Sequence, residues 1–115
     1  MRKKGYKGRC EKREVSKSKE VCRLYSAIQI KYLDVLQESS DIQEIRCNVL
    51  MDGLEQGAYM TDFVCVRTDG DLLVRECVER KHLTKPMTVK LLDASLEYWK
   101  RHGVQDWGIV IDAEK

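Results

Sequence analysis

The chain has 115 residues and a mass of 13.4 kDa, which is enough for one domain with a single core and too little for two. Its composition is 43% hydrophobic and 35% charged with one proline, as in an ordinary globular protein. No segment approaches the roughly 18 apolar residues of a membrane span, and no apolar run follows the basic N-terminus as in a signal peptide. The composition therefore argues against a membrane protein and predicts a cytoplasmic one.

Positive charge is concentrated at the N-terminus. Residues 1–20 contain nine Lys or Arg and three Glu, a net +6, so the rest of the chain carries −4 of the overall +2. We predict that residues 1–19 form a flexible basic arm whose Lys3, Lys4, Lys7 and Arg9 bind DNA phosphates and release counterions. The alternative is a solvated, disordered terminus without a partner.

The cysteines give no metal or disulfide signal. Cys10, Cys22, Cys47, Cys65 and Cys77 are odd in number and contain no Cys-x-x-Cys spacing. Four of them lie within apolar periodic segments, so we expect reduced, buried thiols that act as small hydrophobic residues.

Along the chain, the first expected element is a helix that begins at Val21. Val21, Leu24, Tyr32 and Val35 recur at helical spacing until the polar run 38–41 interrupts the pattern. Ile42 to Leu50 then has the composition of a strand.

Two further strands are expected at 58–67 and 71–80, joined by Asp69-Gly70, a strong hairpin signal. A second helix should begin at Pro86 and end before Gly103, with Met87 and Tyr98 on its buried face. Residues 107–111 should form a last strand. This order predicts an α/β domain over 20–115, with a mixed sheet made of a three-stranded meander and a crossover strand, flanked by two helices.

Each strand of the expected hairpin contains one unusual carboxylate, Asp62 and Glu76. In a two-residue loop, Thr68 pairs with Asp71, and Asp62 shares a face with Glu79 and Lys81. In a three-residue loop with a bulge, Arg67 pairs with Asp71, and Asp62 lies opposite Glu76. Both registers place an acid beside Asp62.

Adjacent carboxylates raise each other's pKa unless a cation lies between them. Oxygen ligands of this kind favour magnesium or manganese, and hence phosphoryl chemistry. The alternative is an ordinary ion pair with a neighbouring arginine such as Arg75 or Arg80.

The order of elements, with Asp on the second strand and Glu on the third, resembles the PD-(D/E)XK nuclease superfamily. Residues 20–112 resemble more closely the N-terminal nuclease domain of TnsA-type transposon endonucleases, in a T-P-D-F-like element, an Asp-Gly turn and an acid fourteen residues after Asp62. The resemblance implies a restriction-endonuclease-like fold. It also implies that Asp62, Glu76 and the backbone carbonyl of Cys77 bind Mg²⁺ or Mn²⁺.

The chain departs from the family pattern at two functional positions. Gln29 stands where the family has a third acid, and Val78 stands where it has the lysine that positions the attacking water. Gln29 can still orient a water or a ligand. Arg80, Lys81 or Lys90 is expected to supply the missing cation, and the Glu79–Lys81 segment is an alternative Glu-x-Lys motif.

The resemblance implies a metal-dependent endonuclease that cuts double-stranded DNA at the ends of mobile elements, associated with the nucleoid. The alternative is a catalytically impaired nuclease-fold module that binds DNA or docks a transposase subunit. The missing acid and lysine favour this alternative, as does a length that leaves no room for a C-terminal partner-binding region. A homodimer is compatible with either.

Overall fold

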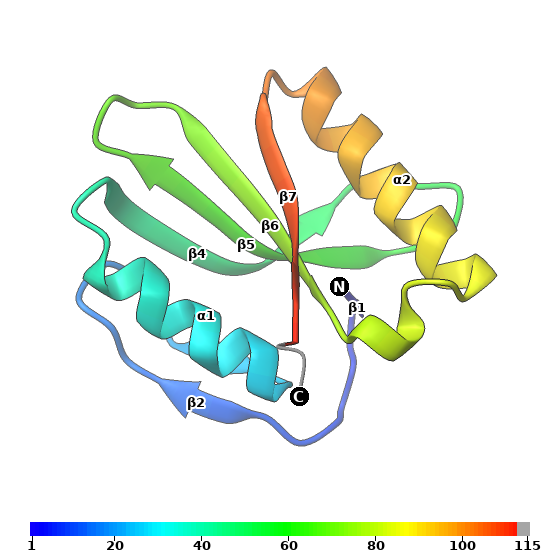
Figure 1. Cartoon of the computed structure of the whole chain (residues 1–115), viewed down its shortest axis with the longest axis horizontal. Helices are drawn as coiled ribbons and strands as arrows, with labels where there is room; N and C mark the ends of the chain where they lie inside the picture. The colour runs from blue at the N-terminus through cyan, green and yellow to red at the C-terminus, as the bar shows by residue number, and fades with distance from the viewer. Residues whose placement is uncertain (113–115) are drawn as a thin grey trace.

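The computed structural model describes residues 1–112, and it has the predicted α/β architecture of a mixed sheet with two helices (Figure 1). The main elements are α1 (Ala27–Glu38), β4 (Ile42–Met51), β5 (Tyr59–Arg67), β6 (Leu72–Val78), α2 (Pro86–Arg101) and β7 (Asp106–Ile111). Strands β4, β5 and β6 form the antiparallel meander, and β7 pairs in parallel with β6 after the crossover through α2.

The segment before α1 differs from the sequence-based prediction. A short strand, β3 (Cys22–Leu24), occupies the place of the expected first helical turn. The helix begins only at Ala27, because Ser26 is its N-cap and accepts a hydrogen bond from the Gln29 N–H at 3.3 Å. The expected apolar face was also wrong at its ends, since Val21 and Val35 are exposed.

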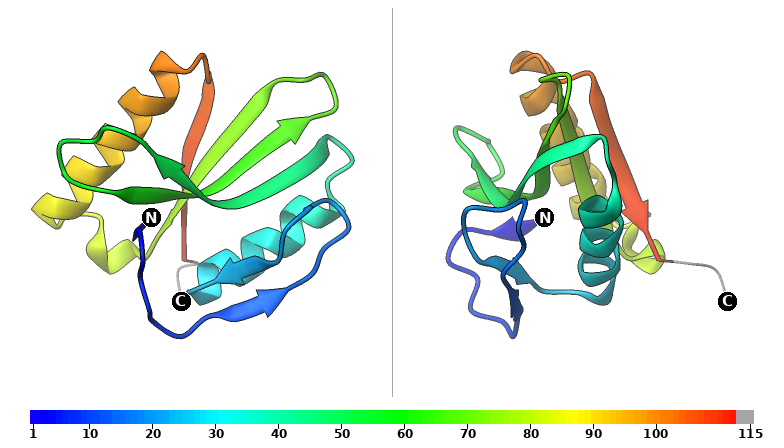
Figure 2. Two further views of the ribbon diagram at one scale, coloured as in Figure 1. Left: turned by 180° about the vertical axis from the view of Figure 1, so that it is seen from behind. Right: turned by 90° about the vertical axis from the view of Figure 1, so that its left-hand side faces the viewer.

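Residues 1–19, expected as a flexible arm, contribute two strands. Strand β1 (Arg2–Lys3) pairs antiparallel with β5, and β2 (Glu11–Arg13) pairs with β3. The carbonyl of Lys17 accepts a hydrogen bond from the Ile45 N–H at 2.9 Å. The β2–β3 hairpin lies beside α1 (Figure 2), so this segment is tied to the body at several points.

The two helices cover opposite faces of the sheet. Phe63 and Cys65 pack with α1, whereas Val64, between them on β5, packs with Trp99 of α2. Successive strand residues point to opposite faces, so each helix covers a separate apolar cluster. The buried residues of α2 are Leu92, Ser95 and Trp99. The buried face of this helix is therefore rotated from the expected one, which included the exposed Met87.

All five cysteines are free thiols, of which Cys22 and Cys65 are fully buried. Within residues 1–112, no helix is both long and apolar enough to span a membrane.

Candidate acid-pair site

The structure decides between the two hairpin registers that the sequence left open. The Arg67 N–H donates to the Asp71 carbonyl at 2.8 Å, and the Gly70 N–H donates to the Arg67 carbonyl at 2.9 Å. Gly70 has a φ of 91°, the left-handed conformation of a three-residue loop with a bulge. In this register Phe63 pairs with Arg75, so Asp62 and Glu76 lie opposite each other at the next position.

The acid pair lies at a fork in the sheet. Strand β6 pairs with β5 only as far as Phe63, and β1 pairs with β5 further along, at Tyr59 and Met60. Strand β4 pairs with β5 from Ile42 to Met51 and occupies the other edge. Asp62 therefore lies on the stretch of β5 between the end of the β6 pairing and the start of the β1 pairing.

Asp62 is 1% exposed and both of its carboxylate oxygens are held. Oδ1 accepts from Gln29 Nε2 at 2.6 Å. Oδ2 accepts from the Cys77 N–H at 2.7 Å and from the α-ammonium of Met1 at 2.6 Å. A buried carboxylate with donors on every side is fixed in one orientation.

Glu76 is fully buried and is held from the α2 side. Its Oε1 accepts from the Asp62 N–H at 3.0 Å, and its Oε2 accepts from the Ser95 hydroxyl at 2.5 Å. The Ser95 hydroxyl in turn accepts from Trp107 Nε1 at 3.0 Å. The backbone pairing of β5 with β6 ends at Phe63. Beyond this point, where the strands diverge, the carboxylates of Glu76 and Asp62 accept from the Asp62 and Cys77 N–H groups in place of backbone carbonyls.

The environment of Glu76 disfavours its charged form. Burial, followed by repulsion from Asp62, raises the pKa of Glu76 to about 7, although the Met1 ammonium and the bonds from Ser95 and the Asp62 N–H oppose the shift. A cation beside the pair offsets this repulsion, as the Met1 ammonium at Asp62 does.

The acid pair could bind magnesium as part of its ligand shell, but the protein does not supply a complete set of ligands there. Within residues 1–112, no group of three or more His, Cys, Asp or Glu side chains is placed to hold a metal ion. Magnesium needs only one or two carboxylates, with water and substrate oxygens completing the shell. The Met1 ammonium beside Asp62 Oδ2 shows that a positive group fits at this position. The Cys77 N–H faces Asp62, and its carbonyl faces the same way because the two groups of a strand residue share a side.

A pocket of about 160 Å³ adjoins the acid pair. Its walls come from the N-terminus, the start of α1, the end of β6 and the start of α2. They include Arg2, Ser26, Cys77, Glu79, His82 and Thr88. The other lining residues are apolar, and neither Asp62 nor Glu76 lines the pocket, so a ligand there would lie beside Met1 and Cys77, which contact Asp62.

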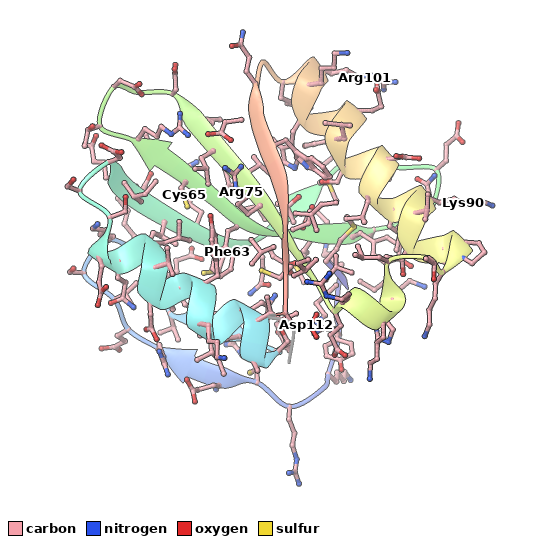
Figure 3. The ribbon with its side chains drawn as sticks, in the orientation of Figure 1. Phe63, Cys65, Arg75, Lys90, Arg101 and Asp112 are labelled. Atoms are coloured by element: carbon pink, nitrogen blue, oxygen red, sulfur yellow. The ribbon has the colours of Figure 1, made fainter. Side chains whose placement is uncertain are left out.

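The residues expected to supply the missing cation lie elsewhere. Arg80 is in the short 3-10 helix η1 (Arg80–His82), not on the β6 face of Glu76, and its backbone N–H and guanidinium bind Asp112. Lys81 is exposed and pairs with Glu79 at 3.2 Å. Lys90 points away from the sheet on the outer side of α2 (Figure 3). Arg75, named as an ion-pair partner for the acids, pairs instead with Asp106 at 2.7 Å.

The four expected DNA-binding residues, Lys3, Lys4, Lys7 and Arg9, are all exposed on the segment that contains β1. Gln29, in contrast, is 3% exposed and directly contacts Asp62. Of the predicted catalytic residues, the structure therefore brings together Asp62, Glu76 and Gln29.

Sequence reasoning missed three groups at the site. Ser95 had a usable signal, since a serine lies between Leu92 and Trp99 at helical spacing on a buried face. The Met1 ammonium and Arg2 had none, because only long-range strand pairing brings them to β5.

The fold and the site define an α/β protein with a buried, fully hydrogen-bonded acid pair at a fork in its sheet. The sequence matches no protein-family model, and no curated protein is similar enough to count as a match. The likeness to TnsA-type endonucleases therefore stays a resemblance of motif.

Proposed function

We propose that the chain is a magnesium-dependent endonuclease of duplex DNA, with a restriction-endonuclease-like fold and a TnsA-like role at mobile-element ends. The observation that carries the proposal is the pairing of Asp62 with Glu76, two buried carboxylates on adjacent diverging strands. Burying two acids side by side is costly unless cations and hydrogen-bond donors compensate their charges. A metal ion would take this role in place of the Met1 ammonium, which contacts Asp62 Oδ2.

In this proposal Asp62, Glu76 and the Cys77 carbonyl hold Mg²⁺ or Mn²⁺. The chemistry that such an ion supplies is a lower pKa for an attacking water and neutralisation of phosphate charge. Gln29 fixes Asp62 through Oδ1, and Ser95 fixes Glu76 through Oε2. These contacts keep both carboxylates oriented before any ligand arrives, and such preorganisation is the chain's own contribution to the reaction.

The substrate in this proposal is double-stranded DNA. The exposed Lys3, Lys4, Lys7 and Arg9 supply sequence-independent attraction to phosphates. A nucleoid location follows from DNA binding, and a transposase subunit or a second copy is the protein partner to look for.

A second candidate is a module that binds DNA or a transposase without cutting. The observation in its favour is the complete hydrogen bonding of both acids, which leaves Gln29, a neutral group, where a third ligand would be. In this alternative the acid pair has a structural role and holds α1, β5, β6 and α2 together.

Nicking of supercoiled plasmid distinguishes the two. With Mg²⁺ or Mn²⁺, the wild type should nick the plasmid, and Asp62→Asn should reduce the rate by at least about a hundredfold, because it removes the charge opposite the metal. Asp52→Asn, the same change at an exposed turn, is the matched control and should keep full activity. Equal inactivity of all three proteins, with DNA binding intact, would support the module.

A further inference from the structure

Arg2 is positioned at the acid pair by strand pairing. It lies opposite Met60 of β5, two residues before Asp62, and the Lys4 N–H donates to the Ala58 carbonyl at 2.7 Å to extend the pairing. Strand β1 therefore places the Arg2 guanidinium near the fork in the sheet.

Two aromatic rings hold the guanidinium in place. Its central carbon lies 5.2 Å from the ring centre of Tyr6 and 5.5 Å from that of Tyr25. The rings meet edge to face at 5.3 Å. Cation–π contacts of this kind orient an arginine without using its N–H donors.

One of these donors has no partner. Within residues 1–112, Arg2 Nε is the buried side-chain nitrogen or oxygen that makes no hydrogen bond. A buried donor without an acceptor destabilises the fold, so native proteins rarely retain one. This nitrogen has no exposed surface, so an anionic ligand would contact the Arg2 guanidinium where it lines the pocket and would satisfy Nε through a shift of the side chain.

The pocket beside the acid pair has room for such a ligand. Arg2 lines it together with Ser26, His82 and Thr88, which offer further hydrogen-bonding groups, and with Glu79, which does not favour an anion. Its volume of about 160 Å³ would hold roughly five waters at about 30 Å³ each. Among the described residues that line this pocket, Arg2 has the only lysine or arginine side chain, and Val78 adds no charge.

We infer that Arg2 binds a phosphate oxygen of the DNA backbone in this pocket, beside Met1 and Cys77, the two residues of its lining that contact Asp62. This inference rests on the proposed function and names a phosphate-contacting residue within it. Arginine suits the role because its donors match the oxygens of a phosphodiester.

The test follows the Arg2 Nε–H signal by NMR on the whole chain labelled with ¹⁵N. The signal is assigned by its absence in Arg2→Lys and is followed while a short DNA duplex is added with Mg²⁺. We expect it to shift at the same duplex concentrations that saturate binding, because the unpaired donor acquires an acceptor.

Fluorescence anisotropy supplies the second measurement. Arg2→Gln should weaken duplex binding about tenfold, the loss of one charged hydrogen bond, and Arg2→Lys should lie between it and the wild type. Arg101→Gln, the same charge change at the far end of α2 (Figure 3), should have a much smaller effect. Urea unfolding of each variant checks that the fold is kept.

The outcomes separate this inference from the proposed function. Duplex binding with an unmoved Arg2 signal, or with equal losses for Arg2→Gln and Arg101→Gln, would overturn the inference alone. An Arg2-dependent complex without plasmid nicking would keep the inference and reject the nuclease. A wild type that binds no duplex would overturn both.

Discussion

The amide of Gln29 is matched to a site that has no third acid. Its Nε2 donates to Asp62 Oδ1, and its Oε1 accepts from the Tyr25 N–H, both at 2.6 Å. A carboxylate at this position could keep the second bond but not the first. The neutral side chain therefore stabilises the acid pair where a third acid would repel it.

This arrangement makes Gln29→Glu a probe for the metal that does not depend on activity. Without divalent cations, the variant should lose about 2 to 3 kcal/mol of unfolding free energy, because two carboxylates then face each other without a proton donor. Saturating Mg²⁺ should restore most of this, since a ligand at a hundred times its Kd adds about 2.7 kcal/mol. Urea unfolding with Mg²⁺ or with a chelator measures both values.

Gln37→Glu, the same change near the end of α1, is the control and should show no Mg²⁺ dependence. A Gln29→Glu protein that is equally unstable with and without Mg²⁺ would contradict a metal at Asp62.

At the scale of elements, the register of the β5–β6 hairpin determines which acidic side chain lies beside Asp62. Its bulged three-residue loop places Asp62 opposite Glu76, and a two-residue loop would have offered Glu79 instead. The loop needs a residue with positive φ at Gly70. A Cβ added there would meet no atom within 4 Å, so the preference for glycine is conformational and not steric.

Gly70→Ala should therefore cost about 1 to 2 kcal/mol of unfolding free energy, the price of a left-handed alanine. Gly70→Asn should recover much of this loss, since asparagine tolerates the conformation. Urea unfolding compares the three proteins. Duplex affinity should stay at the wild-type value in both variants, and an alanine variant as stable as the wild type would contradict the loop type.

At the scale of the whole molecule, the excess of positive charge in residues 1–20 includes the exposed side chains of Lys3, Lys4, Lys7 and Arg9 on one surface segment. Deleting residues 1–19 would be a poor test of DNA binding, because it also removes β1 from β5 and the Lys17 contact to Ile45. Neutralising exposed side chains keeps these contacts.

Replacing Lys3, Lys4, Lys7 and Arg9 together by Gln should weaken duplex binding and lower its salt slope by about 3 to 4, since each phosphate contact contributes about 0.9. Fluorescence anisotropy across a range of KCl concentrations measures the slope. A matched control replaces the exposed Lys31, Lys85, Lys90 and Lys100 by Gln and keeps the same net charge. Equal slopes in the two variants would show that the N-terminal charges act only through net charge.

The residue pattern alone determined most of the elements from Ile42 onward. Strands β4 and β5, the start of α2 at Pro86 and the crossover to β7 follow from alternation, turn residues and helix-end signals, all of which act over a few neighbouring residues. Asp62 and Glu76 could be singled out for the same reason, because a charge in an apolar run is visible locally.

Only the tertiary structure decided what surrounds the acids. The register of the hairpin depends on whether one glycine adds a bulge, and the sequence permits both forms. Ser95 reaches Glu76 because α2 packs on one face of the sheet, and Gln29 reaches Asp62 from α1. In sequence, the N-terminal segment looks like a solvated basic arm. In the structure it enters the site, because β6 leaves an edge of β5 unpaired and β1 pairs with that edge. This contact joins residues some sixty positions apart, and no local pattern encodes it.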